Sequence, residues 1–209
     1  LIPPVKFIPL FEKNGFIVNL DMYVYKSVLQ CLRERLDNGE SVVPISLNVS
    51  RFHVNNPNIV KDINELVKSY NIDPKLVEFE LTESAFMKNA DRLIEKMIGL
   101  KKVGFKISVD DFGSGFSSLN LLKEFPANTL KIDKAFLDET TNSQRSKDIV
   151  KSIVDMAKNI NMEVICEGVE TREQADFLKE IGCEMAQGYL FAKPMPREDF
   201  EELLNVNYI

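Results

Sequence analysis

Short β-branched runs alternate along this chain with longer segments that show the apolar period of a helix. In one such segment Ile149, Val150 and Ile153 lie on a single helical stripe. Thr171 followed by Gln174 predicts a capping box at the start of another helix. Repeated strand–helix units predict parallel strands, in an open sheet or a closed barrel. The expected strands are 42–49, 77–82, 106–110, 129–132, 163–168 and 184–187, and helices at 7–14 and 20–36 precede the first of them.

Polar residues fall on one face of successive strands, near the C-terminal ends. In the first strand Ile45 and Leu47 alternate with Ser46 and Asn48, and the later strands repeat the pattern. An open sheet binds ligands at one switch point, whereas a barrel gathers residues from many strands at one mouth. The pattern therefore favours an α/β fold of the (β/α) TIM-barrel type. About six of its eight strands are present, so we expect an incomplete barrel.

Composition narrows the class of protein. The 209 residues are 44% hydrophobic, carry a net charge of -6 and show no linker-like segment, which predicts one domain over 1–209. The negative charge argues against DNA binding, and no apolar run reaches the roughly 20 residues of a membrane span. Three cysteines at no metal or disulfide spacing predict free thiols and a cytoplasmic location. The only histidine, His53, stands in a polar loop and is expected at the surface.

The residues at the strand ends supply oxygen ligands, which suit Mg²⁺ or Mn²⁺ better than Zn²⁺. Lys131 beside them can hold an anion or a metal-bound hydroxide, or can form a plain ion pair with Asp133. Such a site fits attack of metal-activated water on phosphorus, and it equally fits enolate chemistry with a lysine base. The candidate metal ligands are Asn48, Glu80, Asp110, Asp111 and Glu167.

Six segments together resemble the motifs of one family. They are SLNVS (46–50), FELTES (79–84), VDDFGSGFSSL (109–119), LKIDKAF (130–136), CEGVET (166–171) and QGYLFAKP (187–194). In this order they resemble the EAL domain, a bacterial phosphodiesterase domain that hydrolyses cyclic dimeric GMP. The resemblance covers nearly the whole chain, but the Glu-Ala-Leu signature itself would stand just before Leu1 and is not in this sequence. The resemblance therefore implies a barrel that is incomplete at the N-terminus.

The resemblance implies a role for each matching residue. Asn48, Glu80 and Asp110 match metal ligands, and Asp111 matches a ligand of a second metal. Lys131, Glu167 and Gln187 match the catalytic positions, where the lysine positions the attacking water, Glu167 is also a metal ligand and the glutamine lies near that water. The remaining matches are supporting carboxylates and loop glycines: Glu83, Glu170, Gly113 and Gly115, with Glu170 expected to anchor the DFGSG loop.

The implied function is hydrolysis of cyclic dimeric GMP to the linear dinucleotide, with Mg²⁺ or Mn²⁺, in bacterial second-messenger signalling. The alternative is a non-catalytic receptor or docking domain for the same dinucleotide. We expect a homodimer or other self-association, and nucleotide cyclase or sensor domains in the full-length protein, which segments outside this sequence could anchor to a membrane. Because the signature glutamate is a metal ligand in the family, we expect the 209-residue chain by itself to be inactive.

Overall fold

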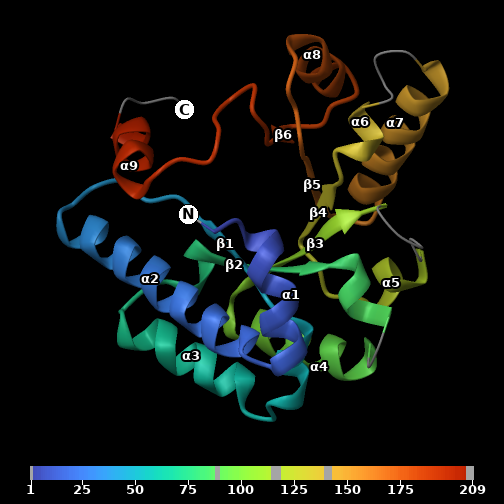
Figure 1. Ribbon diagram of the computed structural model, residues 1–209. Helices are drawn as coiled ribbons and strands as arrows, with labels where there is room; N and C mark the ends of the chain where they lie inside the picture. The colour runs from blue at the N-terminus through green and yellow to red at the C-terminus, as the bar shows by residue number, and fades with distance from the viewer. Residues whose placement is uncertain (1, 88–89, 114–118, 139–142, 206–209) are drawn as a thin grey trace. The chain divides into compact units, whose positions relative to one another are not determined.

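The computed structural model in Figure 1 describes residues 2–87, 90–113, 119–138 and 143–205. The chain forms two compact units, each described by itself. The first comprises Leu1–Val109 with Ser118–Ala127, and the second comprises Asp110–Ser117 with Asn128–Ile209. The strand β3 (Lys106–Phe112) begins in the first unit and ends in the second.

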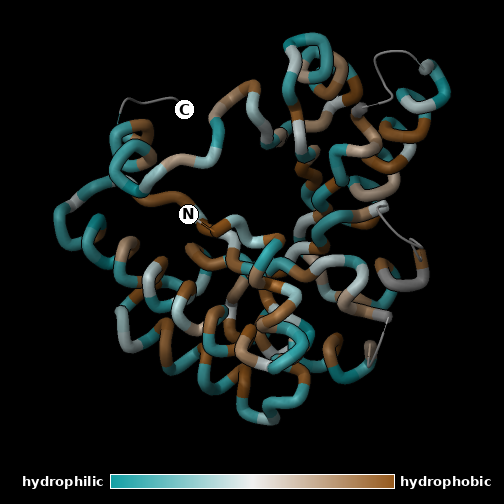
Figure 2. The backbone as a smooth tube through the Cα atoms, viewed as in Figure 1, coloured by the Kyte–Doolittle hydropathy of each residue, from teal (hydrophilic) through white to brown (hydrophobic). Residues whose placement is uncertain are grey.

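The first unit alternates helices with strands. The structure gives it α1 (Pro4–Asn14), α2 (Ile17–Asp37), β1 (Ile45–Asn48), η1 (Arg51–Asn55), α3 (Ile59–Ser69), η2 (Pro74–Leu76), β2 (Val77–Thr82), η3 (Glu83–Met87), α4 (Ala90–Val103) and α5 (Leu119–Glu124). Helices α3 and α4 pack against each other, and α2 packs against β1. Apolar and polar residues alternate around α2, α3 and α4 in Figure 2, as the helical period predicts.

The second unit continues the same alternation. It contains β4 (Thr129–Ile132), α6 (Ala135–Asp138), α7 (Gln144–Asn159), β5 (Glu163–Cys166), α8 (Arg172–Glu180), β6 (Met185–Ala186) and α9 (Arg197–Asn205). The capping box expected at the start of α8 is confirmed: the Gln174 amide N–H donates to Thr171 Oγ1, and the Gln174 side chain accepts from the Thr171 amide.

Strands are hydrogen-bonded in the order in which they occur in the chain, from β1 to β6. The pairs β1–β2, β4–β5 and β5–β6 are parallel. Parallel strands in sequential order, each followed by a helix, are the arrangement of a (β/α) barrel, so the expected fold class is confirmed. All six expected strands occur, although four of them have different ends: β1, β5 and β6 are shorter than expected and β3 is longer.

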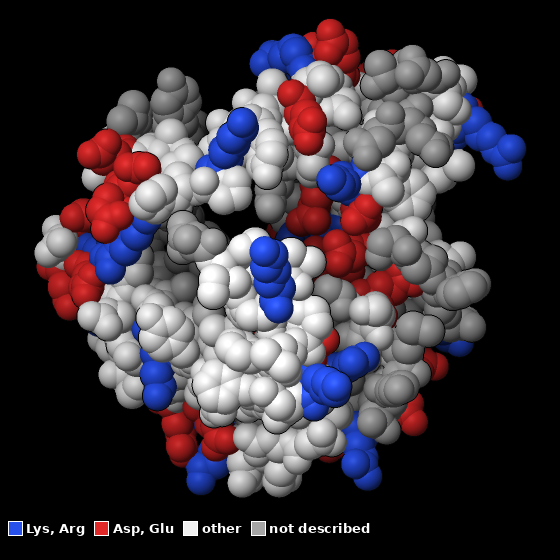
Figure 3. Space-filling view, viewed as in Figure 1, with Lys and Arg blue, Asp and Glu red and all other residues white. Residues whose placement is uncertain are grey.

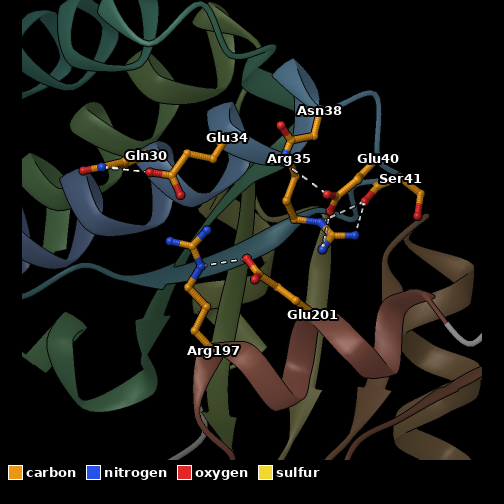
Figure 4. A network of polar contacts seen from close by, with 8 residues as sticks. All are labelled: Gln30, Glu34, Arg35, Asn38, Glu40, Ser41, Arg197 and Glu201. Atoms are coloured by element: carbon orange, nitrogen blue, oxygen red, sulfur yellow. Dashed lines mark hydrogen bonds and ion pairs between the residues drawn. The ribbon is translucent and has the colours of Figure 1, made fainter.

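The segment that leads into β1 is held by a buried arginine of α2. The guanidinium of Arg35, 3% exposed, donates twice to the Ser41 carbonyl oxygen and forms a 2.9 Å ion pair with Glu40 (Figure 4). The hydrogen bond Gln30–Glu34 joins residues one helical turn apart on α2. The hydrogen bond Arg197–Glu201 does the same on α9. Arg35 therefore sets where the chain enters the strand that carries Asn48.

On the face drawn in Figure 3, basic side chains are scattered among acidic ones rather than gathered into one patch over the described residues. Within the same described part of the chain, no helix combines the length and the apolar character needed to cross a bilayer.

Candidate divalent-metal site

Three carboxylates of the second unit form the densest acidic cluster among the described residues. One oxygen each from Asp110, Asp111 and Glu167 lies within 4.8 Å of the others. Successive side chains of a regular strand point to opposite faces, yet Asp110 and Asp111 are neighbours in β3. Asp111 has a φ of 54°, in the left-handed region that aspartate tolerates better than most residues. This backbone turn allows both carboxylates to join one cluster.

Lys131 supplies the cation of the cluster. Its Nζ lies 2.7 Å from Glu167 Oε1 and 3.3 Å from Asp110 Oδ1, and the lysine is 5% exposed. The β4–β5 register explains the first contact, because Lys131 is paired with Ile165 and Glu167 follows two residues later on the same face. The amide of Glu167 extends the ladder by donating to the Ile132 carbonyl oxygen at 3.0 Å.

A cavity of about 340 Å³ opens beside these side chains. Asp111 and Glu167 line it with two further predicted residues, Glu170 and Gln187. The amide of Gln187 donates to the Cys166 carbonyl oxygen at 2.8 Å, which fixes the end of β6 next to β5. The second unit thus brings Asp110, Asp111, Lys131, Glu167, Glu170 and Gln187 into one neighbourhood.

Asp133 also lines this cavity, and the sequence reasoning considered it only as an ion-pair partner of Lys131. Burial raises the pKa of Asp111, and the negative charges of Asp110 and Asp133 raise it further, together with a hydrogen bond to Asp133. Lys131 opposes the shift. The position of Asp133 directly after β4, two residues from Lys131, is the signal that could have identified it.

Two glycines let the backbone pass close to the cluster. Gly113 has a φ of 95°, and a Cβ there would meet the ring of Phe136. Gly168, beside Glu167, has a φ of 67°, and a Cβ would meet the Cβ of Lys134. Both positions therefore require glycine for conformation and for space. Gly115 lies outside the described residues.

In the first unit, Asn48 and Glu80 are aligned as partners in the parallel β1–β2 pair. Glu80 is 6% exposed, while Asn48 is exposed and lines a cavity of about 560 Å³ with Ser50 and Arg51, among others. Glu83 is 7% exposed at the start of η3. The first unit therefore brings the two predicted ligands Asn48 and Glu80 to one level of the sheet.

The expectation that His53 lies at the surface is wrong. The imidazole is 2% exposed, and its Nε2 lies 2.9 Å from Asp21 Oδ2. Asn55, Asn56 and Pro57 made the segment look like an exposed loop, but η1 turns the histidine toward α2. Nothing in the local sequence indicates the partner 32 residues away.

The acidic cluster fits a hard divalent cation. Its donors are carboxylate oxygens, the ligands that Mg²⁺ and Mn²⁺ prefer. Asp110 Oδ1 is buried and has no hydrogen-bond partner among the described residues, although Lys131 stands 3.3 Å away. A buried carboxylate oxygen without a hydrogen bond is costly, and a cation would satisfy it. Fold and cluster together define an α/β domain with parallel strands and an acidic, metal-competent site.

The chain belongs to the EAL domain family, whose sequence profile matches residues 1–194. It is 36% identical over 198 residues to the bifunctional diguanylate cyclase/cyclic di-GMP phosphodiesterase MucR of Pseudomonas aeruginosa, covering 95% of this chain and 29% of that protein. It is 35% identical over 204 residues to the cyclic di-GMP phosphodiesterase NbdA of the same organism, covering 98% of this chain and 26% of that one. The chain therefore spans well under a third of the length of these curated relatives.

Solved structures agree with the family assignment. A structure described as the PaMucR phosphodiesterase in complex with c-di-GMP superposes with a TM-score of 0.87 at 36% sequence identity. The superposition covers 95% of this chain and 81% of that one. The fold expected from the alternation of strands and helices is thus the fold of an EAL domain.

Proposed function

We propose that residues 1–209 lie in a single EAL-type domain, and that the full-length protein hydrolyses cyclic dimeric GMP to the linear dinucleotide with the help of Mg²⁺ or Mn²⁺. The observation that carries the proposal is the cluster of Asp110, Asp111 and Glu167 with Lys131 paired among them. The names of MucR and NbdA support the substrate, and the complex of the PaMucR phosphodiesterase with c-di-GMP supports the ligand.

The chain's own residues have separable roles in this proposal. Asp110, Asp111 and Glu167 of the second unit would bind the cation, and Asn48 and Glu80 of the first unit are proposed as further metal ligands. A bound divalent cation lowers the pKa of water and neutralises charge on a phosphate. The ammonium of Lys131, which forms ion pairs with Asp110 and Glu167, would position the attacking water. Gln187 would orient that water from the end of β6.

The direct test is incubation of the full-length protein with cyclic dimeric GMP and Mg²⁺ or Mn²⁺, followed by chromatography of the nucleotides. We expect the linear dinucleotide as product and none when EDTA is added. Binding of the dinucleotide without product would identify a receptor instead. No binding and no product would contradict the substrate assignment and leave another barrel chemistry, such as that of an enolase-type lyase.

The proposal extends to the location, the oligomeric state and the neighbouring domains of the protein. We propose that the domain works in the cytoplasm, as a homodimer, within a signalling protein that also carries cyclase or sensor modules. The name of MucR supports the pairing with a cyclase. Sedimentation velocity tests the dimer, and a monomer at micromolar concentration would contradict it.

A further inference from the structure

Three buried side chains of the first unit converge on the backbone that carries Asn48. Asp21 and Tyr25 come from α2, one helical turn apart, and His53 comes from η1. Their exposed fractions are 8%, 2% and 2%. No role in the proposed chemistry has been given to any of them, and burying two ionisable groups and a phenol together is costly unless they are hydrogen-bonded.

Each of three consecutive residues at the end of β1 is fixed by a hydrogen bond. The Tyr25 hydroxyl donates to the Asn48 carbonyl oxygen at 2.9 Å. The Val49 amide donates to the Glu80 carbonyl oxygen at 2.9 Å, and the Ser50 amide donates to Asp21 Oδ2 at 3.2 Å. The backbone around Asn48 is thus held by β2 on one side and by α2 on the other.

His53 locks the aspartate that holds Ser50. Asp21 Oδ2 also accepts from His53 Nε2 at 2.9 Å, which assigns the ring proton to Nε2. The His53 amide donates back to the Ser50 carbonyl oxygen at 3.0 Å, and the Ser50 hydroxyl accepts from the Phe52 amide. Asp21, Ser50 and His53 therefore form a closed ring of contacts, in which each hydrogen bond restricts the next.

The ring of Tyr25 contacts two other aromatic rings. It stacks on His53 at 6.2 Å and meets Phe79 edge-on at 5.6 Å. Burial and the charge of Asp21 raise the pKa of Tyr25 well above its ordinary value, so the hydroxyl keeps its proton and remains a donor to Asn48.

We infer that Asp21, Tyr25 and His53, here called the α2 clamp, are positioning residues for the side chain of Asn48. This inference rests on the proposed role of Asn48 as a metal ligand. The side chain of Asn48 is exposed in its cavity. Among the described residues, no hydrogen bond fixes its side-chain amide. The orientation of the Asn48 side chain toward a cation therefore depends on the position of its backbone, which the clamp fixes. Loss of such outer contacts typically weakens metal binding by about 10- to 100-fold.

The test measures Mn²⁺ binding to the protein by calorimetry, without nucleotide. Tyr25→Phe removes the hydroxyl and keeps the ring, and we expect its Kd for Mn²⁺ to rise by about 10-fold. Tyr23→Phe is the matched control, because Tyr23 lies on the same helix, is 69% exposed and should bind Mn²⁺ like the wild type. His53→Leu should weaken binding, while His53→Gln should restore it, because the glutamine amide can donate to Asp21.

Amide hydrogen exchange gives a readout that does not depend on the metal. Exchange of the Val49 and Ser50 amides should accelerate in Tyr25→Phe and stay unchanged in Tyr23→Phe. Tyr25→Phe protein with a lower unfolding temperature but wild-type Mn²⁺ affinity would overturn the inference and leave the clamp a purely structural role. If the wild-type protein binds cyclic dimeric GMP but no Mn²⁺, the metal role of Asn48 is wrong and this inference fails with it. If the wild-type protein binds Mn²⁺ and Tyr25→Phe binds it equally well, only this inference fails.

Discussion

The Nζ of Lys131 lies 2.7 Å from Oε1 of Glu167, so the ammonium that we assign to the attacking water is fixed by a proposed metal ligand. Lys131→Met keeps the aliphatic length and removes the charge. We expect turnover to fall by about 100-fold or more, as for other preorganised donors, while Mn²⁺ affinity changes far less. Product formation at saturating Mn²⁺ separates the two effects, and near-full turnover would show that Lys131 is only an ion-pair partner.

Glu170 lines the cavity and is expected to support the cation site rather than to bind the metal. Glu170→Gln should raise the Mn²⁺ concentration needed for half-maximal activity by about 10- to 100-fold, and excess Mn²⁺ should restore turnover. Glu173→Gln is the control, because Glu173 is a fully exposed carboxylate in the first turn of α8. Unchanged activity of Glu170→Gln at low Mn²⁺ would remove this role.

Gly168 combines a left-handed backbone with a close approach to Lys134. Gly39→Ala is a matched control, because Gly39 has a φ of 72° with no atom within 4 Å of the added Cβ. The control should lose about 1–2 kcal/mol of unfolding free energy from conformation alone. Gly168→Ala should lose more, by on the order of 1–3 kcal/mol for the overlap, and should also weaken Mn²⁺ binding. If urea unfolding gives Gly168→Ala and Gly39→Ala the same loss of unfolding free energy, the Lys134 side chain moves away from the added Cβ at no cost.

The surroundings of Asp111 oppose a negative charge on its carboxyl group. Its pKa is raised by burial and by Asp110 and Asp133, so the ionised form costs more in the folded than in the unfolded protein. The raised pKa stabilises the folded protein fully below the ordinary pKa of 3.8, where the carboxyl is protonated. This contribution is lost as the pH rises through the pKa that Asp111 has in the folded protein. Metal-free Asp111→Asn should therefore unfold at a higher temperature than wild type at pH 7.

The pH dependence supplies the control for that prediction. Below about pH 3.8 the carboxyl is neutral in both states, and the difference in unfolding temperature between Asp111→Asn and wild type should vanish. With saturating Mn²⁺ at pH 7 the order should reverse, because only the wild-type site gains stability from bound cation. If metal-free Asp111→Asn unfolds at the same temperature as wild type at pH 7, the neighbouring charges do not destabilise the folded protein through Asp111.

The alternation of periods in the sequence predicted the six strands and their parallel order, because strand and helix periods are local properties. It also placed Lys131 and Glu167 at neighbouring strand ends, where their side chains form an ion pair. The left-handed conformation of Asp111 was not predictable, because only a minority of aspartates adopt it and the surrounding structure decides which of them do. The burial of His53 was missed for a related reason: its partner Asp21 lies on a distant helix, and polar neighbours dominate the local pattern.

Asp110→Asn tests the central claim most directly. Asp110 is one of three clustered carboxylates, and the substitution removes its charge with almost no change in shape. We expect the folded variant to lose Mn²⁺ binding and hydrolysis of cyclic dimeric GMP together, while Asp176→Asn on the exposed face of α8 keeps both. An Asp110→Asn protein with near-wild-type turnover in Mg²⁺ or Mn²⁺ would contradict the account.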